Sequence, residues 1–199
     1  MSIIVKTQAE LDKIPLDTNE QICIEFGTWN NPAIVKNKYP CSVVARGNSR
    51  VVARKNSFIV AYDNSSVTAC NNSSVKAFGN SSVKVFDNAS VEAFDNSFIA
   101  AFEKSLVISK GNSSIVARDN SSVVAFDSSF VKAFNNSSVK AFDDSSVEAY
   151  NNSSVAAFDS SLIEANENSS IKAYGNVQVV DKLSSEGSIQ LLGNAQKIC

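Results

Sequence analysis

Three kinds of side-chain group in this chain are candidates for chemistry: serine hydroxyls, aspartate and glutamate carboxylates, and cysteine thiols. The chain has no histidine, so the commonest general base and the usual partner of a serine or cysteine nucleophile are absent. The serines recur at a fixed spacing, and every copy has the same neighbours and no base beside it. We therefore predict that the serines are structural and that the protein is not an enzyme.

Acidic residues also recur at a fixed spacing, which invites comparison with calcium-binding solenoids. Calcium-binding β-rolls use a glycine-rich nonapeptide repeat whose turns supply carbonyl ligands. This chain has only seven glycines, and Asn or Gly often replaces the acid. We prefer the interpretation that these are solvated turn carboxylates and that the protein holds no metal or other cofactor. The residues concerned are Asp63, Asp87, Asp95, Asp119, Asp127, Asp143 and Asp159.

Cysteine spacing, charge and hydropathy exclude several classes of protein. Cys23, Cys41, Cys70 and Cys199 form no CxxC or other paired pattern, which argues against a zinc site or a disulfide framework. The net charge is -2, and the 18 basic and 20 acidic residues are interspersed, so bulk charge predicts no nucleic-acid partner. No signal-like leader or long apolar segment is present, which predicts a cytoplasmic protein, in a bacterial host cell, with no membrane partner.

Octapeptide repeats must position these residues. From Arg46 to Asp181 the sequence divides into 17 octads of the form aromatic, Asp/Asn/Gly, Asn, Ser, Ser, Val, variable, Ala, preceded by a degenerate copy from Lys38 to Ala45. Positions four, six and eight are nearly invariant between copies and alternate with the variable positions five and seven. This period of two predicts a strand with Ser, Val and Ala facing inward. Asp, Asn and Gly at positions two and three predict a turn, because they tolerate left-handed backbone angles.

A single octad cannot bury its inner face, so the octads must stack. Two octads per coil give a flattened coil that small side chains can fill, whereas three would leave a lumen too wide for them. We predict an all-β, parallel, right-handed β-solenoid with 16 residues and two short strands per coil. About eight and a half coils would form a rod on the order of 40 Å long. Third-position asparagines and inward serines should pair with neighbouring coils.

The segments outside the repeat are predicted to cap the open strand edges of the solenoid. Residues 1–37 should form an N-terminal cap, residues 38–181 the solenoid and residues 182–199 a C-terminal cap. In the last segment, Ser188 to Leu192 has the pattern of a final strand. With both ends covered, end-to-end filaments are the less favoured outcome.

The N-terminal cap is predicted to be a small α+β unit. Ser2 to Lys6 has the pattern of a strand, and so does Gln21 to Phe26. Between them, Thr7-Gln8-Ala9-Glu10 forms a capping box that should start a short helix ending before Pro15.

Outward positions in which the copies differ supply the candidate contact residues. Large apolar residues replace the fifth-position serine at Phe98, Phe130 and Leu162, which recur every 32 residues and therefore share one side of a 16-residue coil. Phe58 and Leu106 are predicted to lie on the opposite side. Exposed apolar residues on a flat β-face indicate a contact with another protein or with a second copy. We expect the face of Phe98, Phe130 and Leu162 to be the main interface.

The first position is aromatic in 11 of the 17 octads and should point outward, which gives a stripe along each edge of the rod. Stacked rings would stabilise neighbouring coils by roughly 0.5 to 1.5 kcal/mol per pair. Alternatively, the stripes form an apolar docking surface or a homodimer interface. The position is basic at Arg46, Arg54, Lys110 and Arg118; its aromatic residues are Tyr62, Phe78, Phe86, Phe94, Phe102, Phe126, Phe134, Phe142, Tyr150, Phe158 and Tyr174.

The octads NSSVVA, NSSVKAF and VVARGNS, with the opening KTQAELDKIP, resemble octapeptide-repeat proteins of Gram-positive bacteria, their prophages and phages. The resemblance implies a solenoid and leaves function open, because fold does not fix function. The leading hypothesis is a rigid binding or scaffold protein, in its more pointed form a phage-borne, counter-defence inhibitor of a host factor. The competing hypothesis is a self-assembling structural protein. Ice binding is less favoured because the chain has only four threonines, too few for outward Thr-x-Thr rows.

Overall fold

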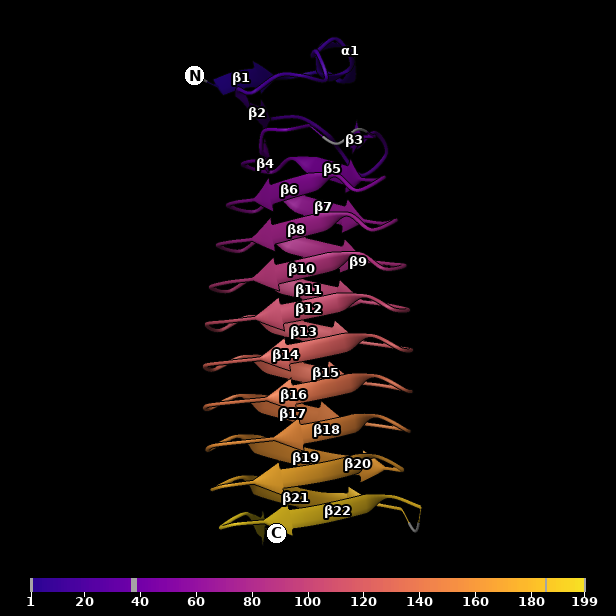
Figure 1. Cartoon of the computed structure of the whole chain (residues 1–199), viewed down its shortest axis with the longest axis vertical. Coiled ribbons are helices and arrows are strands. Elements are labelled where there is room, and N and C mark those ends of the chain that lie inside the picture. Colours follow the sequence, from indigo (N-terminus) through magenta and orange to yellow (C-terminus); the bar gives the residue numbers. More distant parts are fainter. Residues whose placement is uncertain (1, 37–38, 185, 199) are drawn as a thin grey trace.

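The computed structural model describes residues 2–36, 39–184 and 186–198. Over these residues, parallel strands stack into two sheets of 12 and 11 strands, here called sheet A and sheet B (Figure 1). Within the repeat, each strand pairs with strands 16 residues away on both sides, as Ser90 does with Ser74 and Leu106. Each coil therefore consists of two octads, and the predicted parallel β-solenoid with two short strands per coil is confirmed.

The two sheets alternate along the chain, so even-numbered strands of the repeat belong to sheet A and odd-numbered strands to sheet B. Sheet A consists of β1 (Ser2–Val5), β2 (Gln21–Ile24), β4 (Val43–Ala45), β6 (Phe58–Ala61), β8 (Ser74–Ala77), β10 (Ser90–Ala93), β12 (Leu106–Ser109), β14 (Ser122–Ala125), β16 (Ser138–Ala141), β18 (Ser154–Ala157), β20 (Ser170–Tyr174) and β22 (Ser188–Leu192). Sheet B consists of β3 (Ala33–Val35), β5 (Arg50–Ala53), β7 (Ser66–Ala69), β9 (Ser82–Val85), β11 (Phe98–Ala101), β13 (Ser114–Ala117), β15 (Phe130–Ala133), β17 (Ser146–Ala149), β19 (Leu162–Glu167), β21 (Gln178–Leu183) and β23 (Gln196–Ile198).

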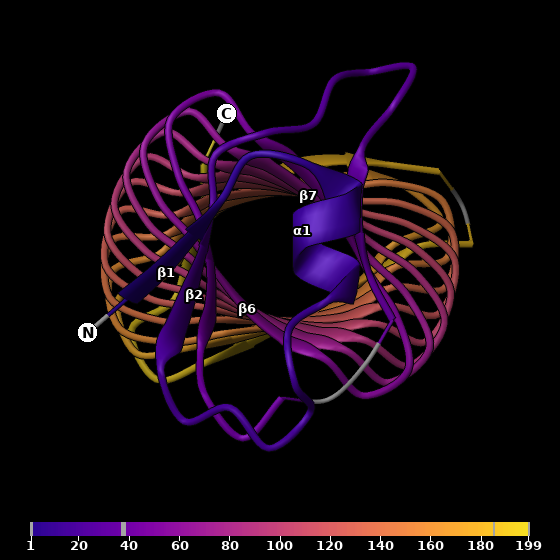
Figure 2. The same cartoon turned by 90° about the horizontal axis from the view of Figure 1, so that it is seen from above.

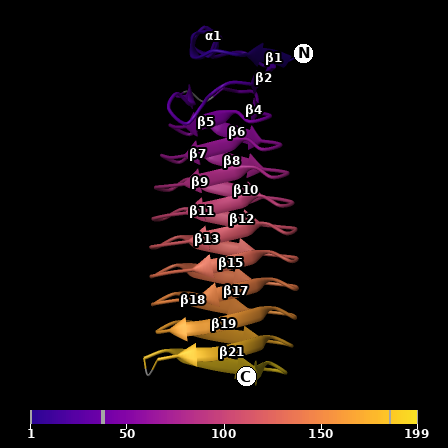
Figure 3. The ribbon, with the colours of Figure 1, turned by 180° about the vertical axis from the view of Figure 1, so that it is seen from behind.

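The solenoid is right-handed and twisted. Figure 1 shows sheet A in front, and Figure 3 shows sheet B from the opposite side. Seen from the N-terminal end, the chain winds clockwise as it recedes from the viewer (Figure 2). The turns fan out in the same view because each coil is rotated slightly against the one before it, as the twist of parallel strands requires.

The inward positions of the octads form one continuous core. The Val or Ile at position six and the Ala at position eight are fully buried along the whole repeat, for example Val83 and Ala77. Side chains of this size leave the two sheets close together, as expected for a 16-residue coil.

The fourth-position serines are buried as predicted, but most of their hydroxyls do not bond to a neighbouring coil; the Ser73 hydroxyl does, donating to the Ala53 carbonyl oxygen at 3.4 Å. The Ser145 hydroxyl is one of several without a hydrogen-bond partner among the described residues. The Ser161 hydroxyl instead donates to the Phe158 carbonyl oxygen of its own octad, at 2.9 Å. The prediction was wrong for most of these serines, whose buried hydroxyls have no partner within hydrogen-bonding distance among the described residues.

Each corner turns at the second position, where φ is positive in all 17 octads. The acids at this position are more than solvated turn residues: their carboxylates accept from the backbone N–H of the second position one coil earlier. Asp95 accepts from Gly79 at 3.1 Å and Asp143 from Asp127 at 3.2 Å, and within the described chain eight such bonds span 2.9–3.4 Å. The carboxylates thereby satisfy N–H groups that the left-handed turn leaves free.

The third-position asparagines are largely exposed, and the predicted amide ladder is not their main contact. Among the described residues, a bond between amides at this position joins only Asn176 and Asn194, at 3.4 Å. Inter-coil side-chain bonding at the corners runs mainly through position two, although the Asn168 side chain also bonds to Ser184 and Glu186 of the next coil.

The N-terminal end is closed by α1 (Gln8–Asp12), which starts at the predicted capping box. The Thr7 hydroxyl accepts from the Glu10 N–H at 3.2 Å, and the Glu10 carboxylate accepts from the Lys6 N–H at 2.7 Å. Figure 2 shows α1 lying over the open end of the coil, where its Leu11 is 1% exposed. The helix therefore supplies the side chain that covers the first coil.

Gln8 blocks the outer edge of β3. Its side-chain carbonyl accepts from the Ile34 N–H at 2.8 Å, and its side-chain NH₂ donates to the Ile34 carbonyl at 3.1 Å. The amide thus makes both bonds that another strand would make, which protects this sheet edge against strand addition.

The two strands predicted in the N-terminal cap are present as β1 and β2, but they belong to sheet A. At the other end β22 spans Ser188–Leu192 as predicted, and β23 follows it. The flanking segments therefore add coils, and the rod is longer than the predicted eight and a half coils.

In the last coil, charged side chains occupy register positions that are inward and apolar elsewhere in the rod. Lys197 on β23 occupies the register position of the buried Val179, and Asp181 occupies that of the buried Ala165. Their side chains form an ion pair, and the hydrogen bond from Lys197 holds the pKa of Asp181 below its usual range. Inward charges at a terminal strand discourage the addition of further strands.

Candidate protein-contact face

The outer face of sheet B carries a row in which large apolar and serine side chains alternate. Phe98, Phe130 and Leu162 lie on β11, β15 and β19, and Ser114 and Ser146 lie between them in direct register. The structure thus places the three apolar residues on one side of the coil, as the 32-residue spacing predicts. Phe98 is 44% exposed and Leu162 41%, while Phe130 is half-buried.

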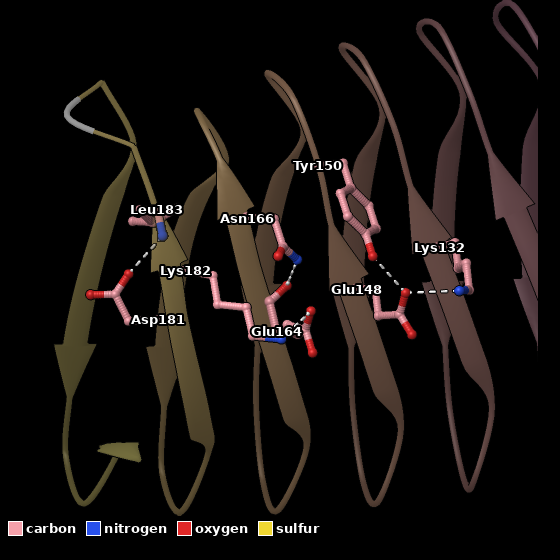
Figure 4. A network of polar contacts seen from close by, with 8 residues as sticks. All are labelled: Lys132, Glu148, Tyr150, Glu164, Asn166, Asp181, Lys182 and Leu183. Atoms are coloured by element: carbon pink, nitrogen blue, oxygen red, sulfur yellow. Dashed lines mark hydrogen bonds and ion pairs between the residues drawn. The ribbon is translucent and has the colours of Figure 1, made fainter. Parts of the chain in front are cut away.

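A charged row runs beside the apolar one at the seventh position. The Lys132 ammonium lies 5.5 Å from the Phe130 ring centroid and pairs with the Glu148 carboxylate at 2.9 Å. The Tyr150 hydroxyl donates to the same carboxylate at 2.8 Å (Figure 4). One coil further on, Glu164 pairs with Lys182 at 2.9 Å.

The network shifts two pKa values. Partial burial raises the pKa of Glu148, but hydrogen bonds from Lys132 and Tyr150 outweigh this effect and leave it below its usual range. The hydrogen bond to Glu148, with burial and nearby carboxylates, raises the pKa of Tyr150 to about 12. These bonds hold the charged side chains in fixed positions next to the apolar row, which favours a defined contact over a mobile surface.

Trp29 extends the face toward the N-terminal end and was not predicted as a contact residue. Its side chain is 74% exposed, and the Arg50 guanidinium at the start of β5 lies 3.4 Å from its ring centroid. Repeat analysis could not identify Trp29, because it lies outside the octads. The available signal was that it is the chain's one tryptophan, a residue type enriched in binding hot spots.

Phe58 and Leu106 lie on sheet A, opposite the face just described, as predicted. Leu106 is 43% exposed, but Phe58 is half-buried and packs against a small outer cluster that contains Val44 and Val60. Phe58 therefore has a structural partner in its own chain.

A groove of about 230 Å³ separates these two apolar residues. Its floor includes Ser74 and Ser90, whose hydroxyl oxygens are 2.8 Å apart. An ion pair between Lys76 and Glu92, at 3.0 Å, lines it as well. Two serines therefore separate the apolar residues on sheet A, whereas a single serine separates them in the row on sheet B.

The first-position rings stack in columns along both edges of the rod. Neighbouring ring centroids are 4.7–5.2 Å apart and the planes are within 15° of parallel. The rings are half-buried except Tyr62, so mainly ring edges meet solvent. The columns are Tyr62, Phe78 and Phe94, then Phe126, Phe142, Phe158 and Tyr174 on one edge, and Phe86 with Phe102 and Phe134 with Tyr150 on the other.

Basic first-position residues continue these columns. Arg46 lies over the Tyr62 ring at 5.8 Å, Lys110 over the Phe94 ring at 5.9 Å, and Arg118 over the Phe134 ring at 4.9 Å. Cation–π contacts of this kind replace a ring-to-ring contact where the aromatic residue is missing. The edge residues are thus accounted for by contacts within the chain, and the apolar row on sheet B is not.

Within the described ranges, no group of three or more His, Cys, Asp or Glu side chains is placed to hold a metal ion. Cys23, Cys41 and Cys70 are free thiols, and Cys199 lies outside the described residues. Among the described residues, no helix has the length and apolar character needed to cross a membrane. Comparison with protein-family models, curated proteins and solved structures finds no match.

Proposed function

We propose that this protein is a rigid, non-enzymatic protein-binding or scaffold module that acts through the outer face of sheet B. The observation that carries the proposal is the exposure of Phe98 and Leu162 in a row whose intervening positions hold Ser114 and Ser146. Large apolar groups held at a flat surface beside ordered charges are typical of protein contacts. Phe98 and Leu162 nevertheless leave 44% and 41% of their surface exposed to solvent.

The proposed partner is a protein of a bacterial host cell, met in its cytoplasm. The resemblance to octapeptide-repeat proteins of Gram-positive bacteria and their phages supports this class. In its more pointed form, the protein is a phage-borne inhibitor that covers a surface of a host defence factor. Such an inhibitor needs a stiff scaffold and no catalytic groups, which suits a rod whose coils are hydrogen-bonded along their whole length.

A self-assembling rod is the weaker alternative. End-to-end addition would require free strand edges, but Gln8 occupies the outer edge of β3 and the Asp181–Lys197 ion pair stands in the last coil. Lateral assembly through the aromatic edges is disfavoured because the rings already stack on each other.

Capture from a lysate of a Gram-positive host tests the proposal. The full chain is compared with a Phe98→Ser, Phe130→Ser, Leu162→Ser variant, and Phe58→Ser, Leu106→Ser serves as the matched control on sheet A. We expect the wild type and the control to retain the same specific host protein and the triple variant to lose it, with all three equally folded by circular dichroism. Equal recovery by the triple variant and the wild type would overturn the proposal.

A further inference from the structure

We propose that a second copy of this chain occupies the outer face of sheet B, packed face to face and antiparallel. The inference rests on the proposed function, because it requires this face to be a protein contact, and it names a second occupant that binds there in competition with the host protein. Two rows of side chains carry it: the alternating row at the fifth position and the charged row at the seventh.

The fifth-position row has the shape of ridges and slots. Phe98 and Phe130 are two coils apart, which is about 9.6 Å at about 4.8 Å per coil, with Ser114 between them. Ser146 forms an equal slot between Phe130 and Leu162. A slot of this width admits one aromatic ring or leucine side chain from a facing surface, and packed sheets lie about 10 Å apart.

A two-fold axis parallel to the strands, placed between β13 and β15, sets this row against the same row of a second copy in reverse order. Phe130 then faces Ser114 of the second copy, and Phe98 faces its Ser146. Leu162 faces Ser82, the preceding serine of the row on β9. All three ridges therefore enter slots, and the same contacts are made twice by symmetry.

The seventh-position row agrees with this register. Lys84 on β9 is exposed and faces Glu164 of the second copy, so two pairs of opposite charge form. Glu148 faces Ala100, and no like charges are opposed. A shift by one coil would instead set ridge against ridge.

The parallel arrangement, with the two-fold axis along the rod, fits less well. It sets the fifth-position row of one copy against the seventh-position row of the other. Phe130 would then face Lys132, and Leu162 would face Glu164, so no apolar side chain enters a serine slot and no ion pair forms between the copies. Charge and shape both favour the antiparallel dimer.

Geometry also sets the size of the contact. Six coils from β9 to β19 span about 29 Å, and a four-residue strand about 13 Å, which gives roughly 400 Å² of face per copy. The twist in Figure 2 confines the contact to these central coils. Because the area lies below the roughly 800 Å² per partner of a standard interface, we expect a weak dimer with a Kd in the micromolar range. The contact closes after two copies and leaves both sheet A faces exposed.

Sedimentation equilibrium of the full chain, from about 5 to 500 µM, tests the inference. We expect the average mass to rise from one copy to two. Lys84→Glu should weaken the dimer about tenfold, because it opposes Glu164 of the second copy. The double variant Lys84→Glu, Glu164→Lys should restore it. Lys140→Glu, a change at an exposed seventh-position lysine on sheet A, is the matched control and should have no effect.

A single-copy mass for the wild type at every concentration would overturn the inference, and so would equal dimerisation by Lys84→Glu. The two experiments distinguish a failure of the dimer from a failure of the proposed host-protein contact. If the wild type stays a single copy while the triple serine variant loses its host protein, the dimer is refuted and the protein-contact face stands. If dimerisation follows the charge swap while host capture does not depend on the face, the host partner is refuted and the dimer stands.

Discussion

Replacement of Phe142 by leucine isolates the contribution of ring stacking to the stability of the solenoid. Phe142 lies between Phe126 and Phe158, with ring centroids at 5.1 and 4.8 Å. Leucine keeps an apolar side chain of similar volume at the corner but removes both ring pairs. At roughly 0.5–1.5 kcal/mol per pair, the stacking loss amounts to about 1–3 kcal/mol, and the change in buried apolar area adds less than about 1 kcal/mol.

Phe86 provides the matched comparison. It is also a half-buried first-position ring, but it stacks on Phe102 alone, at 4.9 Å. Phe86→Leu should therefore lower the free energy of unfolding by about half as much as Phe142→Leu.

Urea unfolding followed by circular dichroism measures both changes, with the slope of the transition checked because repeat arrays can lose two-state behaviour. A loss for Phe86→Leu equal to or larger than that for Phe142→Leu would refute the reasoning. Burial of the corner, and not ring stacking, would then stabilise the edge.

Three further predictions follow from individual contacts. Tyr150→Phe should remove the step near pH 12 from the tyrosinate absorbance titration, and an unchanged titration would contradict this. Because the pKa of Tyr150 is higher in the folded than in the unfolded protein, the stabilisation from its bond to Glu148 is full below about pH 10 and is lost as the pH rises to 12. Ser145→Ala should leave the melting temperature unchanged or raise it, whereas Ser161→Ala should lower the free energy of unfolding by about 1 kcal/mol, and the opposite order in thermal melts would show that the hydroxyls are bonded differently. Lys197→Leu should produce chains joined end to end in light scattering, and an unaltered mass would show that the inward charge does not protect the last coil.

The fold of the repeat could be predicted from sequence, because positions that stay the same in every copy are the buried ones. Val or Ile at position six and Ala at position eight recur along the interior, and side chains this small favour two octads per coil over three. The ends were harder to predict, since β23 has Lys197 at an inward register position and so breaks the apolar alternation that marks a strand.

The candidate face was predictable in part for the same reason. The 32-residue spacing of Phe98 and Phe130 places them on one side of any 16-residue coil, whatever the finer geometry. Trp29 and its contact with Arg50 lie outside the repeat, so no internal comparison could relate them to sheet B. The bonds of the turn carboxylates were missed because they depend on which N–H groups the left-handed turns leave free.

Site-specific photo-crosslinking tests the central claim most directly, namely that the protein acts through the outer face of sheet B. Lys84 on sheet B and Lys140 on sheet A are both exposed seventh-position lysines, and each is replaced in turn by a photoreactive phenylalanine in host cells. The account predicts covalent protein adducts from position 84 and none above background from position 140. Adducts from position 140 alone, or equal yields from both positions, would contradict it.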